Sequence, residues 1–216
     1  MAFSVRQFLK NGLTSYLSFA VSSATGFVMV PLALAYLGSE QYGLLHLVGS
    51  LVNYLALANL GTGTAVMRAV AEARGADRRH DLGATVSTAF AFYLAVGLLG
   101  LGAAALLLPH LPQVFRLTEA HARLGSRLLL LGFAGAAITL PLSVYRGVLV
   151  GRERFDLTNL VQIGQTGGWL LLGAATLWTG GGLLAFLAAQ TLLQVAAGLA
   201  TAWLAHREVP DLRLSP

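Results

Sequence analysis

The chain has 216 residues, of which 56% are hydrophobic and only 11% are charged. A soluble domain carries about 25% charged residues, so composition excludes an ordinary water-facing fold. The net charge of +5 does not indicate a nucleic-acid partner, because the arginines flank apolar segments and form no single basic face.

The first two apolar segments are joined by a short polar turn. A membrane-spanning helix needs ~20 apolar residues, and the uncharged runs before Glu40 and before Arg68 predict spans at 12–37 and 43–68. Gly38 suits the left-handed residue that follows a helix end. Ser39 can cap the next helix, with Glu40 in its first turn. We therefore expect a tight turn between two helices.

The remaining apolar runs predict four more spans, at 83–108, 126–147, 157–178 and 183–205, the last two divided by the glycines of TGGG. Helices satisfy their own backbone hydrogen bonds in lipid, and no short alternating strands are present. The sequence therefore predicts an all-α, polytopic membrane protein with six transmembrane helices. We expect residues 1–206 to form this helical unit and residues 207–216 to form a cytoplasmic tail or linker.

The basic residues indicate an orientation. If the N-terminus is cytoplasmic, all of the 14 lysines and arginines except Arg116, Arg123 and Arg127 lie on the cytoplasmic side. Because such residues concentrate in cytoplasmic loops, we expect both termini inside, in the cell inner (plasma) membrane.

Polar residues inside the spans follow helical spacing. Polar side chains in lipid usually face a bundle interior or a water-filled cavity, but stripes of small residues also serve as ordinary packing faces. Both interpretations stay open for the first span, where Asn11, Ser15, Ser18, Ser22 and Thr25 share one face. The side-chain amides within the spans bring more hydrogen-bond donors and acceptors to membrane depth. They either form hydrogen bonds between helices or line a polar cavity. These residues are Asn53, Asn59, Asn159, Gln162, Gln165, Gln190 and Gln194.

Two arginines and one tryptophan each have two interpretations. Arg68 and Arg146 lie near inner span ends, where they can reach the headgroups or bind a phosphate bidentately. Trp169 lies in mid-span, where it can stack on a sugar ring or pack against a neighbouring helix. The candidate substrate-binding residues are Arg68, Arg146, Asn53, Gln162, Gln165, Ser22 and Trp169.

The sequence gives little support for catalysis, so we do not expect an enzyme. The nine acidic residues all lie outside the predicted spans, and the five histidines lack a metal-binding spacing. There is no cysteine and no phosphate-binding loop, and we expect neither a metal nor another cofactor. Without an intramembrane carboxylate, any ion coupling would rest on other groups or on the membrane potential.

Three segments carry a resemblance to a known family: LGSEQYGL at 37–44, NLGTGTAVMRAVAEARG at 59–75 and YRGVLVGRERFDLTNL at 145–160. The first resembles LG-x-x-x-YG-L after span one, and the second resembles LG-x-x-x-A-x-x-R at the inner end of span two. The third is similar to the link between spans four and five. In their order and spacing these segments resemble the polysaccharide-transport proteins, the Wzx-type lipid-linked oligosaccharide flippases of the multidrug/oligosaccharidyl-lipid/polysaccharide exporter superfamily.

The resemblance implies two six-helix lobes that rock around a central cavity, as alternating-access carriers do. This chain would supply one lobe, and a missing C-terminal half, a second copy or a partner would supply the other. The expected substrate is a polyprenyl-pyrophosphate-linked oligosaccharide, with membrane lipids around it. Arg68 and Arg146 would hold its pyrophosphate, and Asn53, Gln162 and Gln165 would face its sugar. The alternatives are a multidrug or cation exporter and a non-transporting lobe or scaffold in a glycan-synthesis complex.

Overall fold

The computed structural model of the chain describes residues 5–55, 62–73, 79–115 and 118–210, and these residues are almost entirely helical. No strand occurs among them, which confirms the all-α prediction. The elements are α1 (Val5–Tyr54), α2 (Thr62–Ala73), α3 (Arg79–Leu107), the short η2 (Leu108–His110), α4 (Leu111–Phe115), α5 (Glu119–Gly151), α6 (Phe155–Trp178) and α7 (Gly182–Glu208).

Four described helical segments are long and apolar enough to cross a membrane: Leu9–Tyr54, Gly83–Gln113, His121–Gly151 and Gly182–Glu208. They support a multi-pass membrane protein. The first of them contains the expected span 12–37 and the start of the span 43–68, whose residues 56–61 lie outside the described part. Helix α6 coincides with the expected span 157–178, but it is not one of these four segments. Its sequence includes Asn159, Gln162 and Gln165, which make it less apolar than an ordinary spanning helix. The count of six therefore stays a prediction.

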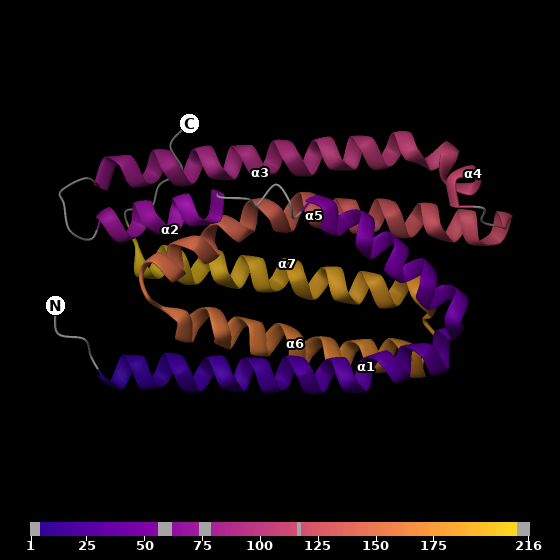
Figure 1. Ribbon diagram of the computed structural model, residues 1–216, viewed down its shortest axis with the longest axis horizontal. Helices are drawn as coiled ribbons and strands as arrows, with labels where there is room; N and C mark the ends of the chain where they lie inside the picture. The colour runs from indigo at the N-terminus through magenta and orange to yellow at the C-terminus, as the bar shows by residue number, and fades with distance from the viewer. Residues whose placement is uncertain (1–4, 56–61, 74–78, 116–117, 211–216) are drawn as a thin grey trace.

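Helix α1 changes direction at Gly38, which has φ 76° and ψ 168°. The first arm of α1 (5–37) runs along one edge of the bundle, and the second arm (39–54) turns back toward α5 (Figure 1). The expected positive φ at Gly38 is confirmed, although ψ lies outside the left-handed helical region, in a region that is essentially reserved for glycine. On α5, His121 Nε2 lies 3.5 Å from the Glu40 carboxylate, so the turn is held against that helix.

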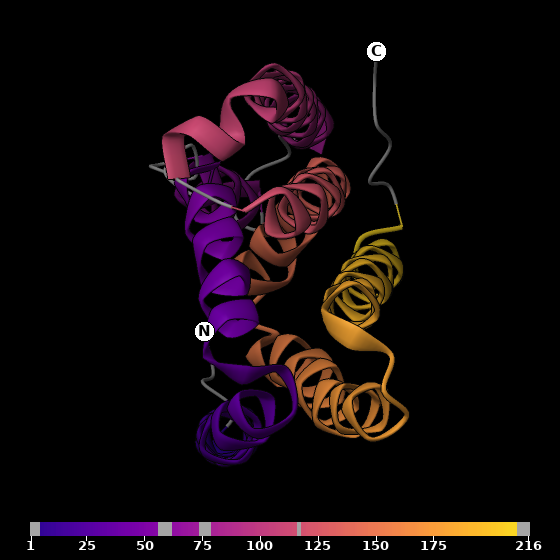
Figure 2. The same ribbon diagram turned by 90° about the vertical axis from the view of Figure 1, so that its right-hand side faces the viewer.

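Helix α5 lies at the centre of the bundle, with α3 on one side and α7 on another (Figure 2). Leu128, Leu129, Val148 and Leu149 of α5 are fully buried. Small residues let the neighbouring helices approach closely: a Cβ on Gly97 of α3 would lie 2.7 Å from the Cα of Ala137. This is the packing expected of membrane helices, whose backbones meet over small side chains.

The polar face of the first arm packs on α6. Ser18 and Thr25 are each only 4% exposed. The side-chain amide of Asn159 donates to Ser15 Oγ at 2.9 Å and to Thr14 Oγ1 at 3.2 Å. The contacts therefore support the packing interpretation of this face over the cavity interpretation.

Candidate binding site

Helix α7 carries a polar stripe on the face that it turns toward α5 and α6. Gln190, Gln194, Gly198 and Thr201 follow one another at intervals of four, four and three residues, which places them on one side of a helix. Two pockets lie along this stripe, and Gln194 lines both of them. The helices that line them are α5, α6, α7 and the second arm of α1, whose arrangement is seen end-on in Figure 2.

The larger pocket, called the arginine pocket here, has a volume of about 450 Å³. It is built where α5, α6 and α7 diverge, and Arg146 is its only charged lining residue among those that the structure describes. The polar side chains that line the pocket together with Arg146 are Thr139, Ser143, Thr158, Gln162, Gln165, Thr166, Gln194 and Thr201. Three of the predicted residues, Arg146, Gln162 and Gln165, therefore meet in one pocket.

Arg146 is exposed to this pocket and forms no ion pair with an acidic side chain in the described part of the chain. A guanidinium presents five donors in a planar fork that matches a phosphate or carboxylate bidentately. Burying a phosphate beside uncharged amides would be costly without a cation. The pocket therefore has the chemistry of a site for an anionic group with polar substituents.

The smaller pocket, called the amide pocket here, has a volume of about 320 Å³ and lies between the second arm of α1, α5 and α7. Its polar lining residues are His46, Ser50, Asn53, Gln190, Thr191 and Gln194. Within the described residues no Asp, Glu, Lys or Arg lines it. Asn53 is the one predicted residue that it contains.

Three predicted residues line neither pocket. Arg68 is exposed on α2, on the side opposite Val66 and Val70, which are buried against α5. Ser22 is half-buried on the first arm. Trp169 packs edge-on against Phe186 of α7, with ring centroids 4.5 Å apart, in agreement with the packing interpretation of this side chain.

The candidate substrate-binding residues left out several pocket residues, among them Ser143 and His46. Gln190 and Gln194 had been named only among the amides that either bond between helices or line a polar cavity, and the pockets favour the cavity interpretation for them. A signal was present, because Gln190 and Gln194 are four residues apart, as are His46 and Ser50. The sequence could not show which helix each of these polar stripes faces. Asn59 lies outside the described residues.

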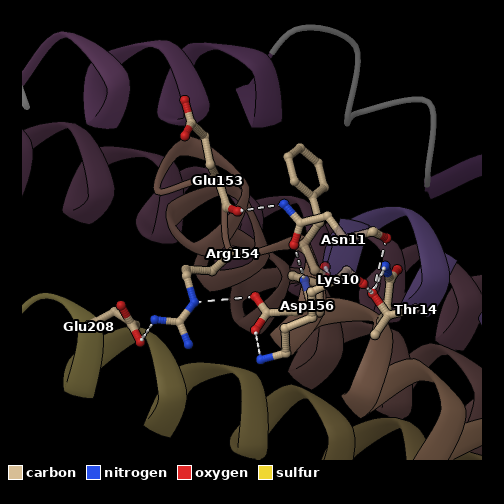
Figure 3. A network of polar contacts seen from close by, with 10 residues as sticks. Lys10, Asn11, Thr14, Glu153, Arg154, Asp156 and Glu208 are labelled. Atoms are coloured by element: carbon tan, nitrogen blue, oxygen red, sulfur yellow. Dashed lines mark hydrogen bonds and ion pairs between the residues drawn. The ribbon is translucent and has the colours of Figure 1, made fainter. Parts of the chain in front are cut away.

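A network of charged side chains ties together the helix ends beside the arginine pocket (Figure 3). At its centre is Asp156, whose side chain is only 2% exposed. Lys10 Nζ of α1 lies 2.7 Å from one carboxylate oxygen, and Arg154 Nε lies 3.2 Å from the other. Arg154 also pairs with Glu208 at the end of α7. The Asn11 side chain accepts from the backbone N–H of Asp156 and donates to the carbonyl of Glu153.

The network keeps Asp156 ionised. Burial by itself would raise the pKa of the Asp156 carboxyl, but the hydrogen bond from Lys10 and the charges of Arg154 and Lys10 outweigh it. Together they hold that pKa below its ordinary value of 3.8. Thr158 of the arginine pocket follows Asp156 by two residues, so the network fixes the α6 end that forms one end of the pocket.

No group of acidic and histidine side chains suited to a metal ion occurs among the described residues.

Comparison with protein-family models gave a match to a family described as "Polysaccharide biosynthesis protein", over residues 8–211. Neither the curated proteins nor the solved structures gave a match.

Proposed function

The chain belongs to the polysaccharide biosynthesis protein family, that of the Wzx-type polysaccharide flippases, and we propose on this basis that it moves a lipid-linked oligosaccharide across the membrane. The substrate is a polyprenyl-pyrophosphate-linked oligosaccharide, carried from the inner to the outer leaflet by alternating access. The six-span lobe works with a second lobe, and both termini lie in the cytoplasm.

One observation carries the proposal. In the described part of the chain, an arginine that forms no ion pair with an acidic side chain lines a pocket of amides and hydroxyls between α5, α6 and α7. An arginine near the inner end of a span can reach the headgroups or bind a phosphate bidentately, and a polar pocket beside its guanidinium favours the second role. In this proposal Arg146 binds the pyrophosphate, Gln162 and Gln165 contact the first sugar, and the polyprenyl tail stays in lipid.

The second arginine of the sequence-based prediction has a different place. Arg68 lies on the exposed face of α2 and outside both pockets. Its role in holding the pyrophosphate therefore depends on the second lobe, and we expect its substitution to lower the transport rate less than that of Arg146.

The alternative of a multidrug or cation exporter is less well supported. A site for organic cations is expected to present a carboxylate or an aromatic cage. The described lining residues of both pockets include neither an acidic side chain nor a Phe, Tyr or Trp ring.

The experiment is a translocation assay in vesicles that contain the complete transporter, with this chain as one of its two lobes, and a polyprenyl-pyrophosphate-linked oligosaccharide of neutral sugars. Transfer to the outer leaflet is read from its accessibility to an added lectin. We expect Arg146→Gln to lower the rate at least tenfold and Arg146→Lys to lower it less, because lysine keeps the charge but not the fork. Arg123→Gln is the matched control, since Arg123 is exposed at the other end of α5. Equal rates for Arg146→Gln and Arg123→Gln would refute the assignment, and efflux of organic cations without lipid transfer would favour the exporter.

A further inference from the structure

We propose that the amide pocket is a second subsite, which receives an uncharged sugar unit of the same ligand whose phosphate occupies the arginine pocket. The inference rests on the proposed function and deepens it, because it assigns separate parts of the substrate to separate pockets. It also selects a class of substrate: oligosaccharides whose sugars near the pyrophosphate carry no charge.

The first step is that the two pockets form one path. Gln194 lines both, and the α7 stripe continues through Leu187, Gln190 and Thr191 on one side and Gly198 and Thr201 on the other. From Gln190 to Thr201 the stripe covers about 16 Å at 1.5 Å per residue. A ligand held at Arg146 that extends along α7 toward the amide pocket would therefore pass Gln194, which lines both pockets.

The second step is the size of the pocket. Binding pockets for small ligands usually enclose about 300–1,000 Å³. The amide pocket, at about 320 Å³, falls at the lower end of this range and suits a short sugar chain.

The third step is the hydrogen-bonding capacity of the lining. Ser50 Oγ donates to the carbonyl of His46 at 2.8 Å, and Thr191 Oγ1 donates to that of Leu187 at 2.9 Å. Each hydroxyl has thus used its proton and presents lone pairs to a ligand. Amides such as Asn53 and Gln190 supply both donors and acceptors. Sugar hydroxyls, which donate and accept at once, match this combination.

The fourth step is charge. No Lys or Arg among the described lining residues faces the amide pocket, so an acidic sugar would lose water there and gain hydrogen bonds from the amides and His46 without a fixed positive charge. The imidazole of His46, which also lines the pocket, packs in a T-shaped arrangement with the Tyr42 ring, with ring centroids 4.4 Å apart. Selection against acidic sugars thus follows from the absence of a cation rather than from a steric barrier.

The structure offers a way to fill the pocket without disturbing the packing. Gly49 lines the amide pocket on the second arm, and a Cβ at this position would meet no heavy atom within 4 Å. Leucine is also a better helix former than glycine. Gly49→Leu should therefore fold and occupy the space proposed for the sugar. Gly26→Leu is the matched control, because Gly26 is an exposed glycine of α1 with equally open surroundings and lines neither pocket.

The experiment measures equilibrium binding of three probes to the purified full chain in lipid nanodiscs. They are polyprenyl pyrophosphate alone, the same lipid carrying a short chain of glucose units (the glucose probe), and the same lipid carrying that chain with glucuronic acid as its last sugar (the glucuronic acid probe). We expect the glucose probe to bind the unsubstituted chain more tightly than the other two. Gly49→Leu should weaken binding of the glucose probe at least tenfold. Gln190→Ala should weaken it about two- to tenfold, because one or two neutral hydrogen bonds are lost. Neither should change the binding of the sugar-free lipid, whereas Arg146→Gln should weaken all three probes.

The outcomes separate the two proposals. If Gly49→Leu behaves like Gly26→Leu with the glucose probe while Arg146→Gln still weakens binding, the sugar subsite is wrong and the proposed function stands. Tighter binding of the glucuronic acid probe than of the glucose probe would also overturn the subsite. If the unsubstituted chain binds none of the probes, or if Arg146→Gln changes nothing, the proposed function fails together with the inference.

Discussion

Neutralising Asp156 should destabilise the chain, because this carboxylate joins three helix ends that are far apart in sequence. Asp156→Asn keeps the shape of the side chain and one acceptor oxygen but removes the charge. The side chain is 2% exposed, so no water replaces the lost contacts. Lys10 and Arg154, which are 58% and 33% exposed, remain charged in the variant.

The magnitude follows from these exposures. The pair with Arg154 is a partly buried, charge-assisted hydrogen bond, for which about 1.5–3 kcal/mol is typical. The pair with Lys10 is largely solvated and contributes about 0.2–1 kcal/mol. Arg154 keeps its contact with Glu208, which limits the loss. We therefore expect a destabilisation of about 2–3 kcal/mol, which for a chain of this size lowers Tm by about 4–12 °C.

The assay is thermal unfolding of the purified chain in detergent, followed by circular dichroism, with Glu72→Gln as the control. Glu72 is an exposed acid on α2, and its neutralisation should leave Tm unchanged. A double-mutant cycle of Asp156→Asn with Lys10→Met measures the interaction energy of the Lys10–Asp156 pair separately from that of the Arg154–Asp156 pair. Equal Tm values for Asp156→Asn and Glu72→Gln would refute the reasoning.

The pH dependence supplies a second test of the same network. The folded pKa of Asp156 lies below the unfolded value of 3.8, so its contribution to stability is present above that value. The contribution is lost as the pH falls from 3.8 through the lower folded pKa. The difference in Tm between the unsubstituted chain and Asp156→Asn should therefore be constant from pH 5 to 8 and shrink only below about pH 4.

Three further predictions concern the turn of α1, the core and the orientation. Gly38→Ala should destabilise the chain by about 1–3 kcal/mol in the same thermal assay, because alanine is strained at φ 76°, ψ 168°. The Cβ itself would meet no heavy atom within 4 Å, so the strain is in the backbone. An unchanged Tm would contradict the turn geometry. Tyr93→Phe should raise the stability by about 1 kcal/mol, since the Tyr93 hydroxyl is buried and finds no hydrogen-bond partner among the described residues; a lowered Tm would reveal a partner. The chain has no cysteine, so Thr179→Cys and Arg207→Cys introduce unique thiols at exposed positions. A membrane-impermeant maleimide should label the first in intact cells and the second only after permeabilisation, and the reverse pattern would invert the proposed orientation.

Local signals in the sequence predicted helix ends well. The expected spans 157–178 and 183–205 correspond to α6 and α7, because charged residues precede α6 and a glycine turn separates the two helices. In that turn Gly180 and Gly182 both have φ 70°, so here and at Gly38 the glycines mark positions that other residues rarely adopt.

The relation between helices could not be predicted in the same way. Helical periodicity shows which residues of one helix share a face, but not which neighbour that face meets. Arg68 and Arg146 are equivalent in sequence, each near an inner span end. Packing of Val66 and Val70 toward α5 turns Arg68 away from both pockets, whereas Arg146 lies between α5, α6 and α7. The polar face of the first arm likewise meets α6 and not a pocket.

The contact between the first arm and α6 has a consequence for how the protein is made. Lys10 and Asp156 are separated by 146 positions along the chain, and the hydrogen bonds of Asn159 to Thr14 and Ser15 span almost as many. A ribosome adds about 5–20 residues per second, so the nascent first helix waits roughly 7–30 s for the segment that will cover its polar face. During that interval Ser18 and Thr25 must be sheltered by the insertion machinery or by the helices already made. The order of synthesis therefore places this polar face in the membrane before the helix that covers it.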